Sequence, residues 1–80
     1  MSIKARLKQL GYLPYTETDI IWLKRINNFC TLRIIINGEK IFDAMVEQNA
    51  FVRKKEEIKE LEKSFELLEK DLEKLLWVKV

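Results

Sequence analysis

The 80-residue chain has no histidine, one cysteine, one proline and two glycines. One cysteine excludes an intrachain disulfide, and without histidine the common zinc sites lack their ligands. Histidine is also the usual general base for a serine or cysteine nucleophile, so Cys30 is expected to be a buried apolar residue. Two glycines are too few for the loops that cradle phosphates. We therefore expect no catalytic site, no metal, no cofactor and no enzymatic activity.

Long apolar runs are missing as well. No stretch approaches the 18 apolar residues that a membrane-spanning helix needs, so no membrane contact is expected. Residues 1–6 carry charges where a signal peptide would have its apolar region. A single thiol fits a reducing compartment. The expected location is therefore the cytoplasm.

Length and charge indicate one domain, residues 1–80, that associates with a partner. A chain this short buries a smaller fraction of its surface than larger domains do, so self-association or binding is a natural supplement. Residues 1–40 carry seven Lys or Arg against three Asp or Glu, a net charge of +4. Residues 41–80 carry eight against ten, a net charge of −2. The two halves are electrostatically complementary.

The chain opens with the pattern of a short helix. Ile3, Leu7 and Leu10 recur at helical spacing, and Gly11 is placed to end the helix just after its last turn. Residues 12–15 then read as a turn or extended connector, because proline restricts the residue before it.

A second helix is predicted from the Thr16–Asp19 region to about Asn28. Thr16 and Asp19 supply N-caps and an acidic first turn. Apolar residues along two neighbouring lines, such as Leu23 and Ile26, make its apolar stripe broad enough to be buried.

Asn37 and Gly38 lie between two β-branched runs and predict a β-hairpin with a type I′ turn. A two-residue loop would create three cross-strand pairs: Ile36 with Glu39, Ile34 with Ile41, and Leu32 with Asp43. The expected core face carries Leu32, Ile34, Ile36 and Ile41. Such a hairpin is marginal alone, so it needs a covering helix, a third strand or a second copy.

The last element expected is one continuous helix from Asp43 to Leu76. Asp43 can cap it, and no glycine or proline interrupts the run. At 1.5 Å per residue this helix would be about 50 Å long, which exceeds the width of a compact 80-residue domain. The predicted fold is therefore α+β, with a helix-helix-hairpin head (1–42), a long helical arm (43–76) and a strand-like tail (77–80).

The helical arm shows coiled-coil heptads, and its apolar seam is the predicted interface. The seam residues are Phe51, Ile58, Leu61, Phe65, Leu68, Leu72 and Leu75. The flanking e and g positions from Glu57 to Asp71 contain no cation, so two identical seams would repel each other. The seam thus favours a basic counterpart, either the N-terminal half of a second subunit or another protein. The predicted function is protein-protein interaction or assembly by a homo-oligomer, most simply a dimer.

A nucleic-acid-binding module is the alternative function. The candidate basic contact patch consists of Lys4, Arg6, Lys8, Lys24 and Arg25. Together with the hairpin these cations could contact a DNA groove, and the C-terminal helix would then hold two copies together as a dimer. Binding to phosphates would weaken steeply with salt, whereas an apolar seam would not.

Residues 3–12, together with Asn28-Phe29-Cys30, resemble the start of small bacteriophage head-tail connector proteins. The resemblance covers about 30 residues, and it contains no diagnostic motif. Those proteins are mainly helical, unlike the hairpin predicted here. The resemblance implies an accessory or assembly protein of phage type.

Overall fold

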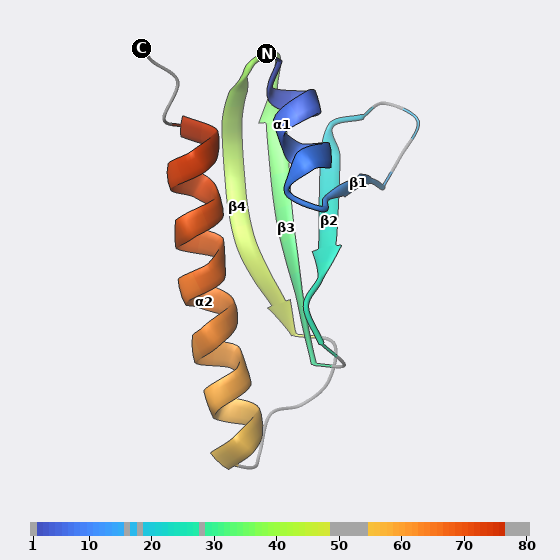
Figure 1. Cartoon of the computed structure of the whole chain (residues 1–80). Helices are drawn as coiled ribbons and strands as arrows, with labels where there is room; N and C mark the ends of the chain where they lie inside the picture. Colours follow the sequence, from blue (N-terminus) through green and yellow to red (C-terminus); the bar gives the residue numbers. More distant parts are fainter. Residues whose placement is uncertain (1, 16, 18, 28, 49–54, 77–80) are drawn as a thin grey trace.

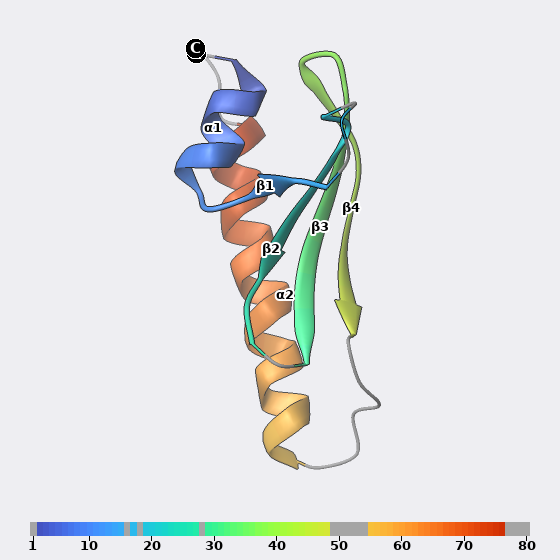
Figure 2. The same cartoon turned by 90° about the vertical axis from the view of Figure 1, so that its right-hand side faces the viewer.

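A computed structural model describes residues 2–15, 17, 19–27, 29–48 and 55–76. Its elements are α1 (Ile3–Gln9), β1 (Leu13–Pro14), β2 (Ile21–Arg25), β3 (Cys30–Asn37), β4 (Lys40–Gln48) and α2 (Lys55–Leu76). The strands form one antiparallel sheet in the order β1-β2-β3-β4. Figures 1 and 2 show both helices on the same side of this sheet, with α2 alongside β4. The opposite face has no covering element among the described residues.

The predicted first helix is confirmed, including its end at Gly11. Ser2 caps α1 by accepting a hydrogen bond from the Ala5 backbone N–H. Gly11 has a φ of +96°, and the Gly11 and Tyr12 N–H groups donate to the carbonyl oxygens of Lys8 and Leu7. This pair of bonds is the Schellman motif, and it turns the chain back so that Tyr12 enters the core.

The predicted second helix is wrong, because residues 21–25 form strand β2. Trp22 is buried while Ile21 and Leu23 on either side are half-buried, which is a period of two rather than 3.6. Trp22 pairs with Ile34 of β3. A run that is apolar on all sides fits either element, and pairing with β3 selects the strand.

The long helix from Asp43 is also wrong, because residues 40–48 form β4 and the helix begins at Lys55. Val46 lies opposite Leu32 and Ala44 opposite Ile34, so the sheet supplies the contacts that decide the conformation. Asp43 caps no helix; its Oδ1 accepts a hydrogen bond from the next backbone N–H within the strand. The 22 residues of α2 span about 33 Å, so the predicted 50 Å arm does not exist.

The predicted hairpin exists within a larger sheet, but its turn lies one residue later than expected. Asn37 pairs with Lys40, so Gly38 and Glu39 form the loop. Gly38 has a φ of +64° whereas the φ of Glu39 is not positive. A glycine with positive φ at the first loop position alone is the pattern of a type II′ turn. The type I′ turn and its three predicted residue pairs are therefore wrong.

A β-bulge at Phe42 shifts the pairing of β4 with β3 by one residue beyond the turn. Ile36 lies opposite Ile41 and Ile35 lies opposite Asp43, which leaves Phe42 as the extra residue of β4. The shift keeps Ile41 on the same face as Ile36 while the rest of β4 alternates normally. Leu32, Ile34 and Ile36 are buried, as predicted for the core face of the hairpin, and Ile41, the fourth residue of that predicted face, is half-buried.

The hydrophobic core lies between the sheet and the two helices. Its buried residues are Ile3, Leu7, Tyr12, Trp22, Leu32, Ile34, Ile36, Leu68 and Leu75. They come from both helices, from β2 and β3 and from the connection after α1. Burial of Cys30, which the sequence also predicted, is confirmed.

Replacing Gly38 by alanine tests the turn. A Cβ at this position would meet no atom within 4 Å, so the expected loss of about 1 kcal/mol comes from the positive φ alone. Urea unfolding measures this loss, and Gly38→Asn is the control, because asparagine tolerates positive φ and should lose less. Equal stability of the alanine variant and the unmodified chain would contradict the assigned turn.

Candidate protein-interaction surfaces

The rotation of α2 about its axis decides which of its residues can contact a partner. Ser64, Leu68, Asp71 and Leu75 are buried and recur at intervals of four, three and four residues, so they form the face that lies on the sheet. Among the α2 side chains that the structure describes, two large apolar ones remain outside: Ile58 is 45% exposed and Phe65 is 50% exposed.

The predicted seam is therefore divided into two lines. Leu68 and Leu75 belong to the core, Leu61 and Leu72 are half-buried, and Ile58 and Phe65 are exposed. Phe51 lies outside the described residues. Leu68 and Leu75 are committed to the fold of the single chain, so a change such as Leu68→Lys would test folding rather than association. Ile58 and Phe65 remain predicted contacts.

A buried polar cluster holds α2 in this rotation. The Oδ2 atom of Asp71 accepts hydrogen bonds from the Tyr12 hydroxyl at 2.9 Å and from Lys24 Nζ at 3.1 Å. Lys24 Nζ also lies 5.3 Å from the centre of the Tyr12 ring, within the range of a cation–π contact. Burial raises the pKa of Tyr12 far above its usual value, and the hydrogen bond to Asp71 and its negative charge add to the rise. Tyr12 therefore remains a protonated donor to Asp71.

Sequence reasoning missed this cluster. Asp71 was assigned to the charged border of the seam and Lys24 to a basic patch. The available signal was that Asp71 lies three residues after Leu68 and four before Leu75, both on the buried line. A carboxylate within an apolar stripe needs a partner, and a cation in another element is the natural candidate.

The contacts of α2 also show which way its exposed residues point. Asp71 and Glu60 mark the side that faces β2, since Glu60 Oε2 accepts a hydrogen bond from Asn27 Nδ2 at 3.3 Å, just after β2. Ile58 and Phe65 lie roughly 120–160° round the helix from these two residues. They are therefore on the β4 side of the helix, and Figure 1 shows α2 at that edge of the sheet.

Acidic residues border this exposed line. Glu62 and Glu69 follow Ile58 and Phe65 by four residues, which places each one turn further along the same side of the helix. Both glutamates are exposed. We call the surface formed by Ile58, Phe65, Leu72, Glu62 and Glu69 the α2 flank. Exposed lysines at positions 59, 63, 70 and 74 lie beyond it, on the solvent side of the helix.

The second surface is the side of the sheet that neither helix covers, which we call the open sheet face. Strand alternation and the register place two groups of residues on it. The bulge residue Phe42 has no partner on β3 and is included with the apolar group because it is exposed and adjoins Asp43 in the chain. The apolar group is Leu13, Ile21, Leu23, Ile35, Phe42 and Met45. The polar group is Arg25, Thr31, Arg33, Asn37, Lys40, Asp43 and Glu47.

Arg33 lies in the middle of the open sheet face. One guanidinium nitrogen lies 2.6 Å from Glu47 Oε1 in an ion pair, and another lies 2.9 Å from the Met45 sulfur. The third, Nε, is buried and has no hydrogen-bond partner among the described residues.

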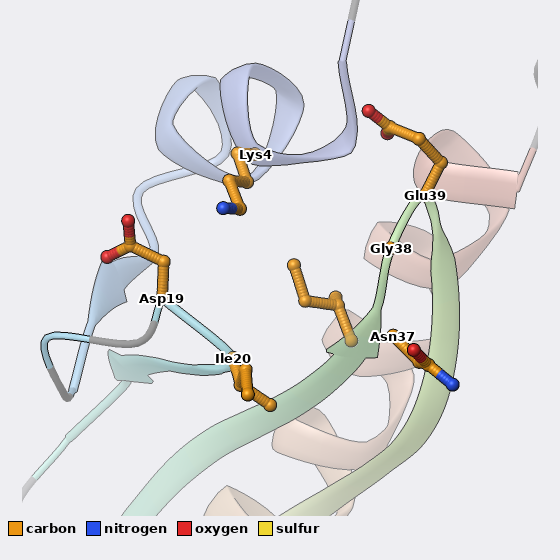
Figure 3. Close-up of a pocket in the computed structure, with 7 residues that line it drawn as sticks. Lys4, Asp19, Ile20, Asn37, Gly38 and Glu39 are labelled. Carbon is orange, nitrogen blue, oxygen red and sulfur yellow. The ribbon is translucent and has the colours of Figure 1, made fainter.

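A cavity of about 370 Å³ lies between α1 and the β3–β4 turn. Figure 3 shows Lys4 reaching into it, with Asp19 and the turn on opposite sides. Glu39 of the turn accepts a hydrogen bond from the Ile3 N–H at 2.7 Å. Asp19 has a φ of +56°, and its carbonyl oxygen accepts a hydrogen bond from Trp22 Nε1 at 2.7 Å. These polar groups hold local structure and mix both charges, so the cavity indicates no ligand class.

The structure does not bring the predicted basic patch together. Lys4 and Lys8 are exposed on α1, and Arg6 is half-buried. Lys24 is bound to Asp71, and strand alternation places Arg25 on the open sheet face, opposite to α1. The five cations therefore form no single surface.

The described part of the chain contains no group of three His, Cys, Asp or Glu residues arranged to hold a metal ion. None of its helices is long and apolar enough to cross a membrane. Comparisons with protein-family models, curated proteins and solved structures found no match.

Replacing Asp71 by alanine tests the polar cluster. The change leaves the Tyr12 hydroxyl and the partly buried Lys24 ammonium without their acceptor, and we expect a loss of about 2–4 kcal/mol in the free energy of unfolding. Glu73→Ala, which removes an exposed acid from the same helix, should change it by less than about 0.5 kcal/mol. Similar losses in both variants, measured by urea unfolding, would show that Asp71 has no special role.

Proposed function

We propose that this chain is a non-enzymatic protein-interaction or assembly module that binds a partner with a basic surface through the α2 flank. The observation that carries the proposal is the exposure of Ile58 and Phe65, about half of each side chain, on a helix whose core face is already filled. Neither residue is needed to complete the core. Exposed apolar residues with a polar border are typical of a binding surface.

The charge of the α2 flank supports a basic partner. Glu62 and Glu69 lie beside the apolar line, and no ion pair involving them is present among the described residues. Cations on the partner would gain from these carboxylates, and a partner with acidic residues would be rejected. Two copies of the flank placed antiparallel would bring the two glutamate rows to the same side of the contact. The flank therefore suits a different sequence better than itself.

The edge of β4 adds a second element to this surface. β4 is the last strand of the sheet, and no described residue pairs with its outer edge. Ala44 and Val46 on its helix side are only half-buried. A partner segment that also runs along β4 would cover these residues. The bulge at Phe42 interrupts regular pairing along the edge, so side-chain contacts with α2 would contribute most of the binding.

We also propose that the chain acts in the cytoplasm. Cys30 is buried and is the only cysteine, which suits the reducing cytoplasm. The chain would act as a homo-oligomer, most simply a dimer, as an accessory protein of phage type.

The binding test uses two designed peptides of about 14 residues, both amphipathic with leucine on one face, and flanked by lysine in one and by glutamate in the other. The lysine peptide should bind and the glutamate peptide should not. Phe65→Ser should weaken binding at least about fivefold, because it removes the largest exposed apolar contact. Fluorescence anisotropy with labelled peptides measures both effects.

The matched control is Phe42→Ser, the same change at a 74% exposed phenylalanine on the open sheet face, which should leave peptide binding unchanged. Equal binding by the two variants would contradict the proposal. Salt-sensitive binding of a DNA duplex that Phe65→Ser does not alter, with no peptide binding, would favour the nucleic-acid function instead.

A further inference from the structure

The open sheet face is more apolar than a solvent-facing sheet surface should be. An antiparallel sheet with one solvated face normally carries polar residues there. Here six apolar residues contribute to that face, and two are among the most exposed of the described chain, Phe42 at 74% and Leu13 at 70%. Leu13, Leu23, Arg33 and Met45 form one row across all four strands. The row makes a continuous surface rather than scattered exposed residues.

From this surface we infer that two copies of the chain pack with their open sheet faces together, forming a two-fold symmetric dimer. The inference rests on the homo-oligomer of the proposed function and assigns it a surface, on the side of the sheet opposite to the helices. Phenylalanine, methionine and arginine, which protein interfaces favour, all occur in it.

Arg33 supplies an independent observation. Its Nε atom is buried on this face without an acceptor, although its other nitrogens contact Glu47 and Met45. The chain itself covers Nε, so a second molecule cannot reach that atom. The Arg33 side chain is nevertheless 30% exposed, and a carboxylate of a molecule lying on the face can contact this exposed part.

The charges of the face favour a second copy as that molecule. Its cations are Arg25, Arg33 and Lys40, and its carboxylates are Asp43 and Glu47. The signs are mixed and nearly balanced, so identical faces attract or tolerate each other, unlike two α2 flanks with their rows of glutamate. A symmetric interface uses the same patch on both subunits and needs this kind of self-complementarity.

Asp43 is the acceptor that the symmetry offers. It lies on the strand next to Arg33, opposite Ile35, and it is exposed. When two copies pack face to face, the two-fold axis lies in the plane of the interface. Its position can be chosen so that one residue of the first copy lies opposite a different residue of the second copy, and the reverse pair then forms as well. Placing the axis between Arg33 and Asp43 creates two equivalent Arg33–Asp43 contacts and stacks β3 and β4 of the two copies, with Phe42, Ile35 and Met45 between them.

The area of the face indicates how strong the dimer is. With strands about 4.8 Å apart and about 3.3 Å per residue, the strand lengths give roughly 400 Å² of projected face per copy. Two copies together would cover about 800 Å² by this measure, which is less than the roughly 1,200 Å² of a stable specific interface, so the dimer is a weak one. We expect dissociation constants of about 1–100 µM and therefore a dimer that forms as concentration rises.

Sedimentation equilibrium of the full chain over about 1–500 µM tests the inference. The unmodified chain should change from monomer to dimer over this range. Phe42→Ser and Asp43→Lys should each raise the dissociation constant at least about tenfold, the first by removing apolar contact and the second by placing a cation near Arg33. Phe65→Ser, on the α2 flank, should dimerise like the unmodified chain. Circular dichroism confirms that each variant is folded.

Three results would overturn the inference. One is a monomer at every concentration, the second is a dimer that neither Phe42→Ser nor Asp43→Lys weakens, and the third is a dimer lost in Phe65→Ser. If Phe42→Ser fails to fold, the Asp43→Lys variant alone decides. Peptide binding by Phe42→Ser is measured separately, so the dimer and the proposed partner surface can fail independently.

Discussion

The structure depends on the contact of one buried carboxylate, Asp71 of α2, with Tyr12 and Lys24. Tyr12 enters the core directly after the end of α1, and Lys24 belongs to β2, so the cluster joins both helices and the sheet. Apolar contacts alone would allow α2 to lie on the sheet in more than one rotation, because it carries two neighbouring apolar lines. A buried carboxylate removes that freedom, since any rotation that separates it from its donors leaves charged groups unpaired.

The α2 flank follows from this constraint, and the open sheet face follows from the side of the sheet on which the helices lie. With Asp71 turned towards β2, the line of Leu68 and Leu75 fills the core, and the line of Ile58 and Phe65 faces outward beside β4. Both helices lie on one side of the sheet, so the other side keeps its apolar residues uncovered. The acidic flank suits a basic partner, and the nearly balanced open sheet face suits a second copy. Under the two proposals, one small chain would join two different molecules through two separate surfaces.

The parts of the fold predicted correctly from sequence are those that local physics determines. Gly11 ends α1 through its own positive φ, and the alternation of Leu32, Ile34 and Ile36 sets the core face of β3. Residues 21–25 and 43–48 were misassigned because their conformation depends on pairing with β3, which helical spacing cannot reveal. The heptad pattern found the apolar residues of α2 but could not tell the buried line from the exposed one. That choice depends on the contacts of Asp71 with Tyr12 and Lys24, which are 59 and 47 residues away from Asp71 in the chain.

The rotation of α2 can be measured directly by the reactivity of introduced thiols. Cys30 is fully buried and should react slowly with a thiol reagent in the folded chain. Phe65→Cys should add one site that reacts almost as fast as a thiol in the unfolded chain. Leu68→Cys, three residues along the helix, should add a protected site that reacts only when the chain opens. Equal reactivity of the two introduced thiols, or faster reaction at position 68, would contradict the assigned rotation and the α2 flank derived from it.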